Sequence, residues 1–270
     1  MRHAMIALLE ARKVRAIVRR SPYADALGAV PPDLFPYWRK TAPDEFPGMP
    51  VRAPAFTHSL EALLMFFDCV ANTGRLCGLP SRAADSVWHA WMRMDRDNLE
   101  QFCRRHFGRL IPHVESGQMN GDMGVALAAC LVESRRLELQ QPASPTLSRL
   151  FTLDRALRMP LGFNYTIEHG VVACARLDAA GLPSGPAHYP AHLTRYALFE
   201  AGLISEAEFR LGAVQAQRQR DGAADQSGGA CGGMALDGGG GDGVGCADGA
   251  GGDAGGDGGS SCGGGCGGGD

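Results

Sequence analysis

The composition of the chain changes abruptly near Arg220, and this break limits where a folded core can form. Residues 221–270 contain 24 of the 38 glycines and eight of the 29 acidic residues, and they contain no Lys or Arg. Such a segment has too little apolar surface to offset the entropy lost on ordering. We therefore expect residues 1–220 to form one globular domain and residues 221–270 to be a disordered Gly/Asp/Cys-rich tail.

The charge of the two parts restricts the class of partner. Residues 1–220 carry a formal charge of +5, and the tail carries −8. A charge of +5 spread over 220 residues is too dilute for a nucleic-acid surface, which needs basic residues gathered on one face.

The longest apolar runs, such as residues 124–132, are far shorter than a membrane span. Glu10 and Arg12 interrupt the apolar N-terminal run before a secretory signal is complete. We expect a cytoplasmic protein that binds neither nucleic acid nor membrane; its partner is not identified by the sequence, and another protein is one candidate.

Apolar residues recur at helical spacing through most of the first 220 residues. This spacing predicts helices over residues 1–20, 57–74, 121–139 and 144–159. Residues 81–107 are predicted to form two helices or one bent helix, because the polar run "RMDRDN" interrupts the apolar pattern. Gly202 separates a last pair of helices, the second of which begins with an S-x-x-E capping box at Ser205 and Glu208.

Residues that favour helix ends stand at the boundaries of these segments. Hydroxyl side chains occupy the expected N-cap positions, which are Thr57 or Ser59, Ser81 and Ser144. Gly74 and Gly108 follow the last apolar residues of their segments, where a left-handed residue can end a helix.

Two segments are predicted to be non-helical. Seven prolines lie between residues 30 and 56. Because each proline removes a backbone donor and restricts the residue before it, we expect no long regular element there, but a segment that wraps over the core. β-Branched and aromatic residues around His169 and Gly170 favour one short β-hairpin within residues 161–190. The expected fold class is mainly α, an irregular helical bundle with these two additions and the disordered tail.

Histidine, tryptophan and cysteine are concentrated in residues 87–113, "VWHAWMRMDRDNLEQFCRRHFGRLIPH". Positions three or four apart share a helix face, so Asp85 can hold the imidazole of His89 in one tautomer. If the two helices fold back on each other, four side chains with zinc-compatible chemistry can converge: His89, Cys103, His106 and His113.

The same residues have a plainer interpretation. The tryptophans and the apolar residues of this segment have the spacing of any buried helical hairpin. His89 can be a core histidine that is satisfied by Asp85, and His106 can face solvent. The cysteines at positions 69, 77, 103, 130 and 174 form no C-x-x-C pair, so they are expected to be mostly reduced and to act as small buried apolar residues.

The runs "ADSVWHAWM" and "NLEQFCRRHFGRLIPH" resemble the glycine-rich domain-containing protein-like family, over about residues 55–115. The positions that carry the resemblance are Asp85, Trp88, His89, Phe102, Cys103, Phe107, Gly108 and His113. Many members of that family have a second histidine two residues after the first, where this chain has Trp91. The resemblance implies a mostly helical fold, implies no particular reaction, and does not supply a metal pair built on two neighbouring histidines.

Four cysteines lie in the tail: Cys231, Cys246, Cys262 and Cys266. Thiolates on a flexible segment can capture soft metals or carry redox chemistry. The Ser-Cys-Gly composition also resembles the core of azole-forming modified peptides. A solubilising extension without chemistry of its own is the simplest alternative.

The sequence contains no G-x-S-x-G, no Walker A and no G-x-G-x-x-G that opens a helix after a strand. The first hypothesis for function is therefore a non-catalytic interaction module with a flexible Gly/Cys tail. The second is a metal-binding protein or metalloenzyme that uses His89 with Cys103, His106 or His113, with zinc as the first candidate metal. The third assigns soft-metal or redox chemistry to the tail cysteines.

Overall fold

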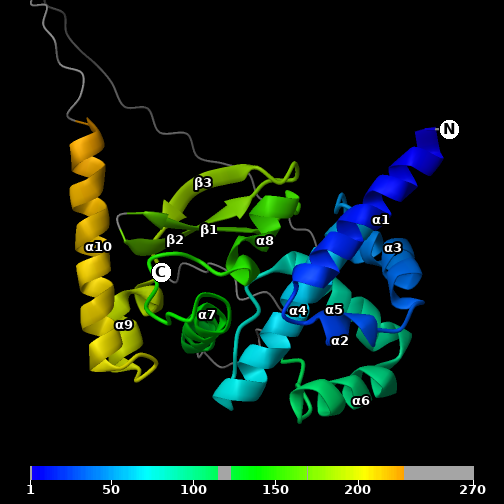
Figure 1. Ribbon diagram of the computed structural model, residues 1–270, viewed down its shortest axis with the longest axis horizontal. Helices are drawn as coiled ribbons and strands as arrows, with labels where there is room; N and C mark the ends of the chain where they lie inside the picture. Colours follow the sequence, from blue (N-terminus) through cyan, green and yellow to red (C-terminus); the bar gives the residue numbers. More distant parts are fainter. Residues whose placement is uncertain (1, 115–122, 169, 228–270) are drawn as a thin grey trace, which may run out of the picture.

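The computed structural model describes residues 2–114, 123–168 and 170–227, and this part of the chain is mainly helical with one small antiparallel sheet (Figure 1). The first half consists of helices α1 to α6, which are Arg2–Arg20, Ala24–Gly28, Leu34–Glu45, Ala53–Thr73, Arg82–Met94 and Arg96–Phe107. The second half contains α7 (Met123–Leu139), α8 (Arg149–Leu157), β1 (Phe163–Glu168), β2 (Val171–Leu177), β3 (Pro183–His188), η2 (Ala191–Leu193), α9 (Arg195–Glu200) and α10 (Glu206–Ser227). None of the helices that the structure describes is both long and apolar enough to cross a lipid bilayer.

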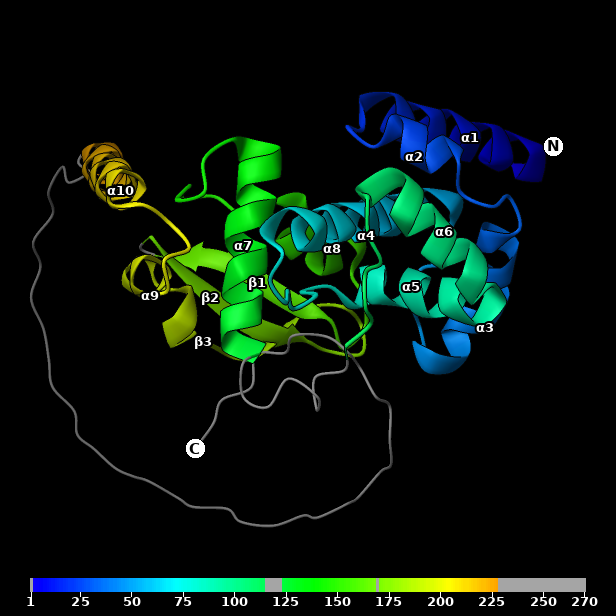
Figure 2. The same ribbon diagram turned by 90° about the horizontal axis from the view of Figure 1, so that it is seen from below.

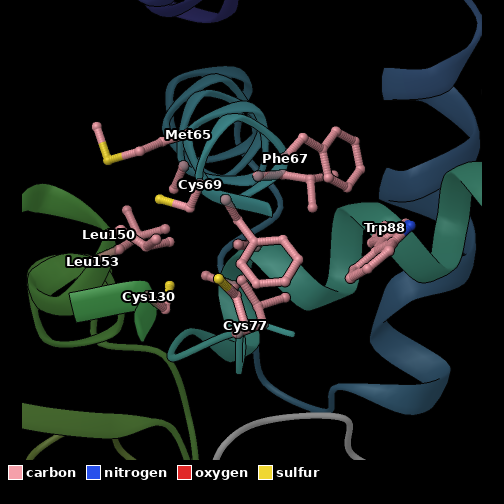
Figure 3. Close-up of a cluster of buried hydrophobic side chains, with 14 of the residues drawn as sticks. Met65, Phe67, Cys69, Cys77, Trp88, Cys130, Leu150 and Leu153 are labelled. Atoms are coloured by element: carbon pink, nitrogen blue, oxygen red, sulfur yellow. The ribbon is translucent and has the colours of Figure 1, made fainter. Parts of the chain in front are cut away.

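Helix α4 forms the centre of the molecule, because it is apolar on nearly all sides and packs against α1, α5, α7 and α8. Figure 3 shows how Met65, Phe67 and Cys69 of α4 face side chains from the neighbouring elements. Those neighbours are Cys77, Trp88, Cys130, Leu150 and Leu153. In both ribbon views α1 and α10 lie at opposite ends of this core (Figures 1 and 2).

Residues 81–107 form two helices, as one of the two predicted arrangements requires. Ser81 caps α5 by accepting a hydrogen bond from the backbone N–H of Ala84. Asp95 ends α5 and caps α6, where its carboxylate accepts from the N–H of Asn98 at 2.9 Å. The predicted helix ends at Gly74 and Gly108 are also confirmed, since both glycines adopt the left-handed conformation.

The Pro-rich segment was wrongly expected to lack long elements, because it contains the whole of α3. Pro36 is the third residue of α3, where a backbone N–H would have no partner within the helix, and Pro43 lies in the last turn. Leu34, Trp38 and Ala42 recur every four residues and are buried, so α3 presents a continuous apolar stripe to α5.

Two predicted helix starts were also wrong. Helix α4 begins at Ala53, with Pro54 in its first turn, and the Thr57 hydroxyl donates back to the carbonyl of Ala53 instead of capping the helix. Helix α8 begins after Ser148, and Ser144 forms a local turn in which its hydroxyl accepts from the N–H of Thr146.

The predicted hairpin is part of a three-stranded sheet in which β2 lies between β1 and β3. Asp154 of α8 joins this sheet to the start of α5. Its buried carboxylate accepts from the Ser81 hydroxyl at 2.7 Å and from the backbone N–H groups of Arg82, Ala83 and Phe163 at 3.0 Å each. This carboxylate therefore fixes the first turn of α5, the helix that carries the candidate site.

Helix α10 continues through residues 221–227, which the sequence analysis assigned to the tail. The predicted capping box at the start of α10 is confirmed, with Ser205 and Glu208 exchanging hydrogen bonds. The four tail cysteines lie outside the described residues.

Candidate metal centre

One face of α5 carries a set of ionisable side chains at helical spacing. Asp85, His89 and Arg93 are successive four-residue neighbours on this helix. Glu45, the last residue of α3, approaches this face because α3 packs along α5. His113 reaches it from the segment that follows the left-handed turn at Gly108.

The nitrogen and oxygen atoms of Asp85, His89 and His113 converge on a small volume. The Nε2 atoms of the two histidines are 3.1 Å apart. Oδ1 of Asp85 is 3.5 Å from Nε2 of His89 and 4.0 Å from Nε2 of His113. Ligands bound tetrahedrally to zinc at about 2.0–2.1 Å lie roughly 3.3–3.4 Å from one another. The three separations therefore bracket the spacing that a transition-metal ion needs.

Glu45 orients the imidazole of His89. Its Oε1 is 2.5 Å from Nδ1 of His89, and its other carboxylate oxygen pairs with the guanidinium of Arg93. Nδ1 of His89 therefore faces Glu45, and Nε2 faces His113 and Asp85. A carboxylate behind a histidine ligand is the usual outer shell of a protein metal site.

Asp85 is completely buried, yet among the residues that the structure describes no group hydrogen-bonds to either of its carboxylate oxygens. Asp154, which is also buried, accepts four hydrogen bonds. A buried carboxylate without donors is costly unless a charge of opposite sign compensates for it. The contrast indicates that the carboxylate of Asp85, unlike that of Asp154, does not stabilise the fold.

The ionisation of the group suits metal binding near neutral pH. Burial raises the pKa of Asp85 to about 6, although the positive charges of His89 and Arg82 oppose this rise. Burial, together with His89 and Arg96, lowers the pKa of His113 to about 4. At pH 7.5 Asp85 is therefore mostly an anion and His113 is neutral, which are the forms that bind cations.

Aromatic rings border the group. The ring of Phe46 lies 6.0 Å from that of His89, and the indole of Trp88 lies edge-on to His113 at 4.5 Å. The low polarity of these surroundings strengthens any electrostatic attraction between the carboxylate and a bound cation.

The structure brings together only part of the predicted ligand set. His89 and His113 belong to the converging group, and the third member is Asp85, which the sequence indicated only as a partner for His89. Within the described part of the chain, Cys103 and His106 lie outside this group. Cys103 is buried, which raises the pKa of its thiol to about 12. The ring of His106 packs against Phe102 at 4.4 Å.

The remaining motif positions have structural roles. Trp88, Trp91, Phe102 and Leu99 are buried, as the interpretation of a helical hairpin core predicted. The alternative of a core histidine with Asp85 as its partner is met in part, because Asp85 lies 3.5 Å from Nε2 of the buried His89, while Nδ1 faces Glu45. Glu45 was missed, since nothing in the sequence links the end of a Pro-rich segment to a histidine 44 positions later.

Residues 54–181 match the model of the UCP032817-like family. The UCP032817-like match contains Asp85, His89 and His113, and it leaves out α3 with Glu45. No curated protein and no solved structure matches the chain. The resemblance to the glycine-rich domain-containing protein-like family stays a prediction.

Proposed function

We propose that the chain is a metal-binding protein in which Asp85, His89 and His113 hold one divalent transition-metal ion, with zinc as the first candidate. The observation that carries the proposal is the buried carboxylate of Asp85, which has two unsatisfied oxygens and faces two imidazole nitrogens. A cation between these three groups compensates the buried charge of Asp85.

Three protein ligands leave at least one coordination position for water or a ligand, as in catalytic zinc sites, whereas structural zinc sites use four. Two histidines and one carboxylate also suit iron(II). A metal ion here would act as a Lewis acid and would lower the pKa of a bound water molecule. The proposal therefore favours a metalloprotein of the catalytic type over a purely structural zinc site.

The test is the metal content of the full chain, measured by plasma mass spectrometry after dialysis. Because the tail cysteines can bind metal themselves, the background carries Cys231→Ser, Cys246→Ser, Cys262→Ser and Cys266→Ser. We expect about one equivalent of zinc or iron in this background and a loss of at least tenfold in His89→Ala and His113→Ala.

Cys103→Ala and His106→Ala provide matched controls, since they remove metal-binding side chains of the same segment that lie outside the group. Both should retain the metal. A metal-free background protein that also takes up no zinc or iron(II) on titration would contradict the proposal.

A second function, binding of another protein through α1, is supported by the exposed apolar residues of that helix. Met5, Ile6, Leu8 and Leu9 are between 49% and 60% exposed, although they form the apolar side of an amphipathic helix. A second copy of the chain offers a matching apolar surface. Sedimentation velocity should then show self-association that Ile6→Asp with Leu8→Asp abolishes, and a monomer at all concentrations would contradict it.

A further inference from the structure

A cavity of about 250 Å³ lies between α5, α6 and the segment that leads to His113. Its wall is mostly apolar, and the imidazole of His113 forms part of it. The apolar lining residues come from all three segments and are Trp88, Met92, Leu99, Leu110, Ile111 and Pro112. The same histidine therefore borders the cavity and belongs to the proposed metal site.

The polar groups of the cavity are few and are placed unevenly. Arg96 and Glu100 are exposed, lie 4.0 Å apart and line one side of the cavity. The thiol of Cys103 lies in the wall, and because burial raises its pKa to about 12, it is a neutral group and not a nucleophile near neutral pH. The interior thus offers apolar contacts but no buried charge of its own.

We infer that this cavity receives the apolar part of a small ligand whose oxygen donor completes the coordination of the metal held by Asp85, His89 and His113. The inference rests on the proposed function and adds the chemical class of the ligand, which is a short alkyl or aryl compound with a carboxylate, hydroxamate or carbonyl oxygen. A pocket that is apolar with a few polar groups at one end is the usual form of a small-molecule site.

The size of the cavity limits the ligand. One water molecule needs roughly 10–15 Å³ of such space, so a cavity of about 250 Å³ has room for an alkyl chain of several carbons. A single methyl group leaves most of the wall uncovered. Affinity should therefore rise with chain length and then level off.

Two hydroxamates of different length test this inference. Acetohydroxamate and octanohydroxamate carry the same metal-binding head, so isothermal titration compares only their apolar parts. The protein is the zinc-loaded full chain in which the four tail cysteines are replaced by serine. We expect octanohydroxamate to bind at least tenfold more tightly. Equal affinities at full zinc occupancy would overturn the inference while leaving the proposed metal site intact, and a chain that binds no zinc would overturn both.

Filling the cavity supplies the second arm of the test. Leu110→Trp places a large side chain in the wall at a position that is 38% exposed and can accommodate it, and Ile111→Trp provides an independent variant. Either variant should reduce the advantage of octanohydroxamate to about twofold without changing zinc content or the affinity for acetohydroxamate. The control is Leu182→Trp, which changes an exposed leucine next to the sheet and should leave both affinities unchanged. A tenfold advantage that persists in both cavity-filling variants would place the alkyl chain elsewhere.

Discussion

At the scale of single residues, Asp154 and Asp85 show that a buried aspartate can either stabilise or destabilise the fold. Asp154 is surrounded by donors that tie α5 to β1, whereas Asp85 is equally buried and, in the described part of the chain, has no donor. Natural proteins retain such destabilising groups mainly where function requires them. The two carboxylates should therefore respond in opposite ways to substitution.

Asp85→Asn is expected to stabilise the metal-free protein at pH 8. Folding raises the pKa of this carboxyl group from 3.8 to about 6, so the folded state binds its proton more tightly than the unfolded state does. The stability of the protein is therefore highest below the unfolded pKa and falls as the pH rises through 6. At pH 8 the loss amounts to about 3 kcal/mol at most, so urea unfolding should show a gain of up to that size in the variant. At pH 4 most of the gain should be lost, because the carboxyl group is then protonated in the folded state and partly so in the unfolded state. The zinc affinity of the variant at pH 8 should fall at least a hundredfold.

Asp154→Asn provides the matched comparison, because it replaces a carboxylate that accepts four hydrogen bonds with an amide, which is a weaker acceptor. This variant should lower the free energy of unfolding by about 2 kcal/mol at both pH values. If Asp85→Asn lost as much stability as Asp154→Asn, Asp85 would be a structural carboxylate.

Local chemistry made many of the single-residue assignments predictable. The caps at Ser81 and Glu208 and the left-handed glycines at positions 74 and 108 depend on neighbours within a few residues, so the sequence suffices. Glu45 could not be found in this way, because its contact with His89 exists only after α3 packs on α5.

At the scale of elements, Arg149 of α8 joins three helices. Its guanidinium bonds both carboxylate oxygens of the buried Glu61 on α4 at 3.2 Å, and it pairs with Glu138 of α7 at 2.5 Å. Burial alone would raise the pKa of Glu61, but hydrogen bonds from His58 and Ser21 and the charge of Arg149 lower it. The positions of α7 and α8 around α4 therefore depend partly on one side chain.

Arg149→Met should lower the free energy of unfolding by about 2 kcal/mol at pH 7, because it leaves Glu61 buried without its main cation. This loss of stability is smaller than that expected for a fully buried pair, because Arg149 is half exposed and solvent screens its charge. The lowered pKa of Glu61 means that its ionic contribution is present above its unfolded pKa and is lost as the pH falls, so the difference from the unchanged chain should shrink below pH 4.

Arg210→Met removes a cation from the exposed pair with Glu206 on α10 and should leave the unfolding midpoint unchanged in the same urea titrations. Equal effects of the two substitutions would show that the Arg149 network contributes no more than an ordinary surface pair.

Elements were predictable where packing and local preference agree. α3 was missed because the prolines were counted while the apolar stripe of Leu34, Trp38 and Ala42 was not weighed against them. The start of α8 was misplaced because Ser144 and Pro145 are residue types that often begin a helix. The chain forms a turn there, and the helix begins four residues later, at Arg149. The third strand, "PSGPAH", carries no β-branched residue and forms because β2 offers it a partner edge.

At the scale of the whole molecule, the candidate centre joins segments that are distant in the sequence. His89 lies on α5, His113 follows α6, and Glu45 connects the centre to α3. Each segment also packs on the core through its own apolar residues, so the fold does not require the metal. The helical class could be predicted from the spacing of apolar residues, but this convergence depends on the turn after α6, whose direction no local pattern in the sequence encodes.

Metal binding should therefore stabilise the protein as a whole. A ligand that binds only the folded state adds about 2.7 kcal/mol at a free concentration one hundred times its Kd. For a domain of this size, that gain corresponds to a rise of roughly 5–10 °C in Tm. Differential scanning calorimetry should detect this rise when zinc is added to the full chain in which the four tail cysteines are replaced by serine, and EDTA should reverse it.

Two histidine variants of that background provide the control. His106→Ala changes a histidine outside the centre and should show the same rise in Tm, whereas His113→Ala should show none. An equal rise in His113→Ala would mean that zinc stabilises the fold through some other group.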